Sequence, residues 1–122
     1  MQHPVKKILL VQRTMAYGTS SAQEALDVAL LASTFEQQVS LLFVDDGVFL
    51  LKKNQKPEQL QLKNFTQAYK ALTLYGIEKI YVAVESLQQR GLTAADLMIP
   101  VAVLDNAEVA KILQAQDAIL TF

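Results

Sequence analysis

Two adjacent carboxylates, Asp45 and Asp46, are the clearest candidates for chemistry in this sequence. They follow an apolar stretch with strand character at 39–44, and Gly47 comes directly after them. Open α/β sheets bind ligands at the carboxyl ends of their strands, so the pair could hold a metal ion or act as acid and base. Adjacent strand residues point to opposite faces, however, so the two carboxylates should not converge. We therefore expect a structural role, in which one aspartate turns the backbone before Gly47.

An anion site is a second candidate. The turn with Gly18, Thr19 and Ser20 leads into a helix, whose free backbone N–H groups could bind an anion. The turn has neither the G-x-G-x-x-G pattern nor a P-loop lysine, and Ser20 and Ser21 are adequately explained as helix caps.

The most basic segment of the chain lies between positions 52 and 70. Its lysines are Lys52, Lys53, Lys56, Lys63 and Lys70. They could contact phosphate, but few aromatic side chains are interleaved with them, so a solvated surface is the favoured interpretation.

Nucleophilic and metal chemistry find little support in the composition. The sequence contains no cysteine, and its one histidine is His3, near the N-terminus. A disulfide framework, a cysteine zinc site and a histidine metal cluster are therefore excluded. No G-x-S-x-G motif occurs, so a serine triad is not expected. Glu85 follows a strand and could act as a general acid or base, but its neighbours in sequence do not support that role.

The length and charge suit one small domain over residues 1–122. The net charge of −1 argues against a protein that mainly grips nucleic acid. The N-terminus lacks the pattern of a secretory signal, and no apolar run approaches the roughly 20 residues that cross a bilayer. We expect a cytoplasmic protein without a membrane segment.

Strand and helix patterns alternate along the chain. Strands are predicted at 7–12, 39–44, 80–84, 98–104 and 118–120, and helices at 21–34, 57–74, 86–90 and 105–116. Ser21 with Glu24 and Asp105 with Glu108 have the spacing of capping boxes. The alternation predicts an α/β fold, a Rossmann-like three-layer arrangement of a mostly parallel, about five-stranded sheet with helices on both faces.

Two apolar segments predict contacts with other subunits. The helix at 21–34 is apolar nearly all round, which indicates packing on two sides, the second against a neighbouring subunit. The run of Val48, Phe49, Leu50 and Leu51 has two compatible interpretations. It could be a strand that extends the sheet, or a subunit contact, since exposed apolar strand edges tend to be paired.

Several stretches carry a family resemblance. They are GT at 18–19, FVDDGVF at 43–49, LYGIE at 74–78, SLQQRGL at 86–92 and the close of the chain at 117–122. With them, nearly the whole chain resembles the TusC-type, DsrF-like members of the DsrE/DsrF-like family. The resemblance implies the DsrE/DsrF-like fold. It also implies a hetero-oligomer with TusB-like and TusD-like sister subunits, a dimer of trimers.

The resemblance further implies a role in a sulfur relay. Such a complex takes persulfide sulfur from a carrier and passes it on until it forms 2-thiouridine at the tRNA wobble position. In the family, the persulfide cysteine belongs to the TusD/DsrE-type partner, near the end of the strand that matches 80–84. Here that region reads Tyr81, Val82, Ala83 and Val84. The chain is then an accessory subunit, without catalytic residues, metal or cofactor.

A persulfide relay needs a thiolate, which this chain cannot supply. Its expected contribution is packing and positioning, without direct tRNA contact. A charged residue in place of Phe49 should release it from the complex. Three alternatives stay open: a DsrF-type role in cytoplasmic sulfur oxidation, a small-ligand or nucleotide-binding module using the Gly18 turn and the aspartates, and, least supported, a carboxylate hydrolase or transferase.

Overall fold

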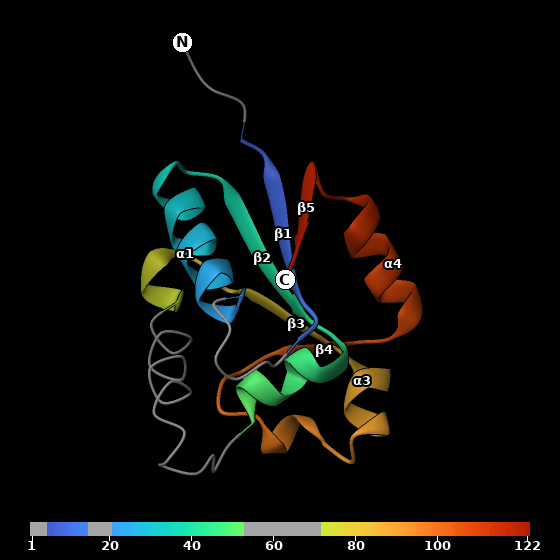
Figure 1. Ribbon diagram of the computed structural model, residues 1–122. Helices are drawn as coiled ribbons and strands as arrows, with labels where there is room; N and C mark the ends of the chain where they lie inside the picture. The colour runs from blue at the N-terminus through green and yellow to red at the C-terminus, as the bar shows by residue number, and fades with distance from the viewer. Residues whose placement is uncertain (1–4, 15–20, 53–71) are drawn as a thin grey trace.

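The computed structural model describes residues 5–14, 21–52 and 72–122, which form a parallel sheet flanked by helices (Figure 1). Five strands lie in the order β4-β3-β2-β1-β5, and every pairing between them is parallel. The strands are β1 (Lys7–Gln12), β2 (Gln38–Phe43), β3 (Lys79–Ala83), β4 (Ala102–Leu104) and β5 (Ala118–Thr121). The predicted fold class is confirmed.

Helices lie on both faces of the sheet, α1 on one and α4 on the other (Figure 1). In the described ranges the α-helices are α1 (Ser21–Thr34), α3 (Val84–Gln89) and α4 (Asn106–Gln114). The same ranges contain the short 3-10 helices η1 (Asp45–Leu51), η2 (Leu72–Tyr75) and η3 (Ala94–Asp96). The sequence pattern did not predict η3. No helix within the described ranges is long and apolar enough to span a membrane.

Alternation along the strands divides the core into two layers. On the α1 face, Leu10 of β1 and Leu41 of β2 pack with Leu26 of the helix. On the other face, Leu9 and Leu42 form a smaller cluster, against which apolar side chains of α4 pack. Strand side chains point alternately to the two faces, and both faces are covered by helices. The central strands β1 and β2 are therefore buried at successive positions rather than at every second one.

Most predicted boundaries differ from the structure by one or two residues, with two larger exceptions. The strand predicted at 98–104 is only Ala102–Leu104, because Pro100 cannot donate to a sheet ladder. It is an edge strand, as the proline suggested. Of the helix predicted at 57–74, positions 57–71 lie outside the described residues, and Leu72–Tyr75 is a 3-10 helix.

One capping box is confirmed. Asp105 accepts a hydrogen bond from the Glu108 backbone N–H at 2.8 Å, and Glu108 accepts one from the Asp105 N–H at 3.1 Å. The first helical residue of α1 is Ser21, so its capping position is residue 20, which lies outside the described residues.

The prediction of a strand at Val48–Leu51 is wrong, because these residues belong to the 3-10 helix η1. Asp45 has φ of 52°, in the left-handed region, and this residue ends the extended path of β2. Val48, Leu50 and Leu51 are then buried in the chain's own core, and Phe49 is half-buried against it. A sister subunit cannot reach the three buried side chains in this fold, so Phe49 alone of the four stays a candidate for contact.

Candidate functional site at the carboxyl ends of the strands

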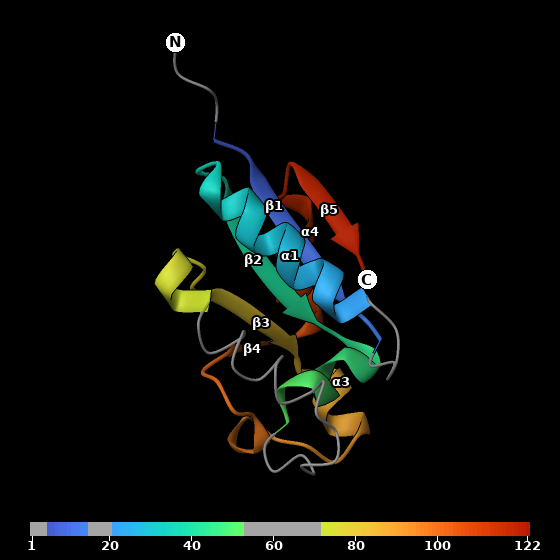
Figure 2. The same cartoon turned by 60° about the vertical axis from the view of Figure 1, so that its left-hand side comes forward.

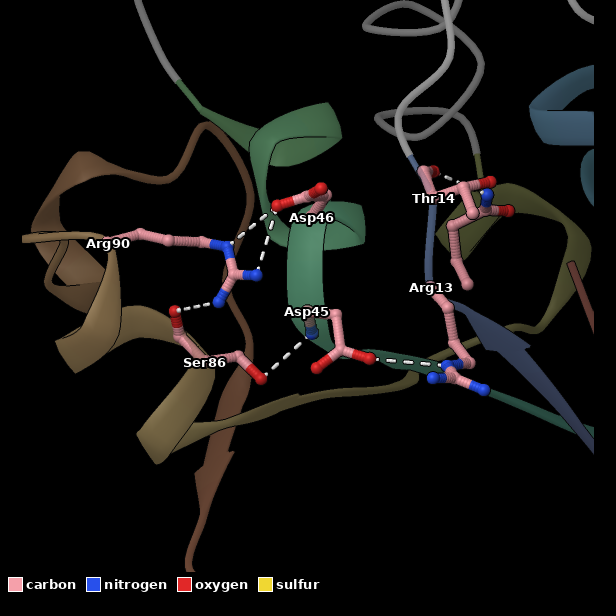
Figure 3. Close-up of polar contacts among 7 residues, drawn as sticks. Arg13, Thr14, Asp45, Asp46, Ser86 and Arg90 are labelled. Atoms are coloured by element: carbon pink, nitrogen blue, oxygen red, sulfur yellow. Dashed lines mark hydrogen bonds and ion pairs between the residues drawn. The ribbon is translucent and has the colours of Figure 1, made fainter.

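The carboxyl ends of β1, β2 and β3 bring together residues that are far apart in sequence (Figure 3). Arg13 directly follows β1, Asp45 and Asp46 begin η1 after β2, and Ser86 and Arg90 lie in and just after α3. Parallel strands place these segments at one edge of the sheet, where α/β proteins commonly bind ligands.

Asp45 interacts with two partners, one through its carboxylate and one through its backbone N–H. Its carboxylate oxygen Oδ2 lies 3.2 Å from Nε of Arg13, and its backbone N–H donates to Oγ of Ser86 at 2.9 Å. The Arg13 and Asp45 side chains are 59% and 50% exposed. Because solvent screens an exposed ion pair, this one should stabilise the fold by about 1 kcal/mol or less. The bond to Ser86 is less exposed and ties η1 to α3.

Asp46 pairs with a different arginine. Nε and Nη2 of Arg90 both donate to Oδ1 of Asp46, at 3.1 and 3.0 Å, and Nη1 donates to the backbone oxygen of Ser86 at 3.2 Å. The Arg90 side chain is only 19% exposed, so three bonds hold it in one geometry. The two carboxylates thus point to separate partners, as Figure 3 shows, and the prediction that they do not converge is confirmed.

Gly47 lets η1 lie directly on the end of β1. A Cβ atom at this position would lie 2.1 Å from the backbone oxygen of Gln12. The Gly47 N–H donates to the backbone oxygens of Arg13, at 3.2 Å, and Val44, at 3.0 Å. Glycine is required here for close approach between backbones rather than for an unusual φ.

The arrangement locks segments together and offers little for catalysis. The Ser86 hydroxyl is buried and accepts from a backbone N–H, and no imidazole is present among the described residues to activate it. Glu85 is exposed. In the ranges that the structure describes, no group of three or more His, Cys, Asp or Glu could hold a metal ion. Because both aspartates are paired with arginine, they lend no support to the nucleotide-binding alternative.

Replacing Ser86 with alanine should lower the free energy of unfolding by roughly 1–3 kcal/mol, because the Asp45 N–H loses its acceptor. Urea denaturation followed by circular dichroism measures this. Ser33→Ala is a matched control with an expected change below about 0.5 kcal/mol, since its hydroxyl donates to the carbonyl of Leu30 within the same helix. Equal losses in the two variants would show that the Ser86 bond does not lock η1.

The predicted anion residues do not join this cluster in the structure. Lys52 is half-buried, and its backbone forms an antiparallel bridge with Leu97. The other predicted residues, Gly18, Thr19, Ser20, Lys53 and Lys56, lie outside the described residues, as does His3.

Sequence reasoning missed Arg13 and Arg90, although a signal for both was present. Arg13 directly follows the first predicted strand, and Arg90 ends the helix predicted after the third. Carboxyl ends of parallel strands meet at one edge, so both arginines could have been expected near the aspartates.

Comparison with known proteins decides the family. The model of the DsrE/DsrF-like family matches residues 6–122. The chain belongs to the DsrE/DsrF-like family. Among curated members, "Intracellular sulfur oxidation protein DsrF" of Allochromatium vinosum is 37% identical, and the alignment covers 100% of both chains. "Protein TusC homolog" of Pseudomonas aeruginosa is also 37% identical, over 95% of this chain and 98% of that protein.

Two solved structures of more distant proteins show the same fold. The ychN protein from E. coli superposes with a TM-score of 0.79 at 23% identity, over 97% of this chain and 100% of that one. MTH1491 from Methanobacterium thermoautotrophicum, a protein of unknown function, gives a TM-score of 0.68 at 15% identity, over 98% and 100% of the two chains. At these identities the likeness concerns the fold alone.

Proposed function

We propose that this chain is a non-catalytic subunit of a cytoplasmic sulfur-relay complex that supports 2-thiolation of the tRNA wobble uridine. Its relatives named TusC homolog and DsrF support a role in a sulfur relay. The TusC name favours the role in tRNA thiolation over the role in sulfur oxidation. In this role the chain holds and positions TusB-like and TusD-like sister subunits, one of which carries the persulfide.

The observation that carries the proposal is the absence of cysteine from the whole 122-residue sequence. Persulfide transfer proceeds through attack by a thiolate, and no other side chain replaces it. At the end of β3, near the place where the resemblance puts the partner's cysteine, this chain has Val84 and Ser86. The Ser86 hydroxyl is buried and bonded to Asp45 N–H, which fits a structural position better than a reactive one.

An exposed apolar surface on α1 and η2 supports contact with a sister subunit. Leu31 and Phe35, at and just after the end of α1, are 61% and 68% exposed, and Leu74 and Tyr75 of η2 are also exposed. The two elements are in contact, and Figure 2 shows η2 on the same side of the sheet as α1. We call these four residues the α1–η2 patch. Apolar side chains gathered on neighbouring elements favour a protein interface. The sequence already predicted a second packed side for this helix.

The α1–η2 patch gives a sharper test of assembly than Phe49. Replacing both Leu31 and Phe35 with lysine should leave the isolated chain folded, because both side chains are exposed. Charges buried at an apolar interface would cost several kcal/mol, so the variant should no longer co-purify with tagged TusB-like and TusD-like subunits from the same genome. Size-exclusion chromatography of the co-expressed proteins measures this.

A paired control uses exposed polar positions of α3, with Gln88→Lys and Gln89→Lys adding the same charge elsewhere. That variant should stay in the complex. Full assembly of the Leu31→Lys, Phe35→Lys protein would rule out the α1–η2 patch as the subunit interface. Failure of the unmodified chain to bind either sister subunit would rule out the proposed function itself.

The equal identity to a DsrF protein favours one second candidate, a subunit for intracellular sulfur oxidation. Deleting the gene in its native cell separates the two roles. Loss of 2-thiouridine from tRNA hydrolysates, measured by mass spectrometry, is expected for the thiolation role. Unchanged 2-thiouridine together with impaired intracellular sulfur oxidation would favour the second candidate.

A further inference from the structure

A cavity of about 180 Å³ lies at the end of the sheet opposite the Ser86 cluster. It is formed by the amino ends of β1, β2 and β3 and by the C-terminal part of α4. Its polar lining residues are Lys7, Gln38, Ser40, Lys79, Tyr81, Lys111 and Gln116, and Oε1 of Gln116 is buried without a hydrogen-bond partner among the described residues.

Strand register explains why these side chains share one face. Lys7 of β1 is opposite Gln38 of β2, and Ser40 of β2 is opposite Lys79 of β3. Side chains alternate along a strand, so Gln38 and Ser40 point to the same side, as do their partners. This is the face that α4 covers (Figure 1), and α4 adds Lys111.

The lining carries an excess of positive charge. None of the three lysines forms an ion pair with a carboxylate in the part of the chain that the structure describes, and no Asp or Glu lines the cavity. The neighbouring Asp117 accepts from the backbone N–H of Lys7 at 2.7 Å. Lys111 lies in the last turn of α4, where a cation balances the helix dipole. The helix dipole accounts for the position of Lys111. It does not account for Lys7 and Lys79, which lie on strands.

Ser40 adds a hydroxyl group that faces the cavity, where solvent or a ligand can reach it. It is only 6% exposed, it lines the cavity, and its hydroxyl has no hydrogen-bond partner among the described residues. A ligand with acceptor oxygens would supply one at the wall of the cavity, within the field of the lysines.

The geometry points to a binding site for a single phosphate group, either inorganic phosphate or the phosphate of a small phosphomonoester. The group's oxygens would accept from the ammonium groups of Lys7, Lys79 and Lys111 and from the Ser40 hydroxyl. The volume is well below the roughly 300–1,000 Å³ of sites that enclose drug-sized ligands, so a whole nucleotide would not be enclosed. The site is independent of the sulfur-relay role.

Amide NMR spectra of the full chain, titrated with sodium phosphate against sodium chloride at equal ionic strength, test the site. Phosphate should cause saturable shifts at Ser40, Lys79 and Lys111. Lys79→Gln with Lys111→Gln should raise the Kd by about tenfold or more, and Ser40→Ala should raise it severalfold with all lysines retained. Lys6→Gln is the matched control: Lys6 is the sequence neighbour of Lys7, does not line the cavity, and should not change the Kd.

A second titration, with ribose 5-phosphate, separates the sources of the phosphate group. Saturable shifts with only one of the two ligands would assign the site to free phosphate or to a phosphomonoester. The site would be overturned by the absence of saturable shifts with both. It would also be overturned if Lys6→Gln weakened binding as much as the double variant, because the lysines would then act only as solvated surface charge.

Discussion

Gly47→Ala is expected to lower the free energy of unfolding by about 3 kcal/mol or more, at the upper end of overpacking effects. An added Cβ would lie 2.1 Å from the Gln12 oxygen, and contacts under 3.0 Å are essentially never seen, so the two backbones must separate by about 0.9 Å. The atom in the way is backbone in β1, which is paired on both sides by β2 and β5 and cannot rotate away. Urea denaturation of the purified chain measures the loss.

Gly76→Ala is the control for Gly47. This glycine has φ of 79°, but no atom lies within 4 Å of an added Cβ. Its replacement should cost only the strain of a left-handed alanine, about 1–2 kcal/mol. NMR shifts of the Gln12 and Arg13 amides should move in the Gly47 variant and not in the control. If the two variants lose equal stability, close packing of η1 on β1 is not what fixes Gly47.

Leu51→Ala should destabilise the isolated chain by about 2–5 kcal/mol, because it leaves a cavity in the main core. The Leu51 side chain is 0% exposed and belongs to the cluster that joins the sheet, α1 and η1. Were Leu51 instead a subunit contact, the same change would weaken association and leave the isolated chain as stable as before. Urea denaturation of the chain alone therefore separates core from interface.

Leu74→Ala makes the same chemical change on the surface. Leu74 is 85% exposed, so the variant should lose less than about 0.5 kcal/mol in the isolated chain. The contrast is useful because Leu74 belongs to the α1–η2 patch, where a cost in assembly is expected instead. A large loss at Leu74 with little at Leu51 would reverse the assignment of the two residues.

The Val48–Leu51 run shows where sequence reasoning reached its limit. A short apolar run has no usable period, so a buried strand and a buried helical segment look alike. Its burial was correctly indicated by its composition, but not its conformation or its partner. Asp45 in the left-handed region and the fit of Gly47 against β1 decide both, and neither is a property of the run itself.

The sequence by itself determined the alternation of strands and helices, the burial of the first strand on both faces and the lack of any thiol. These depend on composition and on short-range periods, which are local properties. Only the tertiary structure decided that Asp45 and Asp46 pair with Arg13 and Arg90, and that lysines from two strands and α4 surround one cavity. Those partners are set by strand order and register, since contacts between segments far apart in the chain leave no local pattern to read.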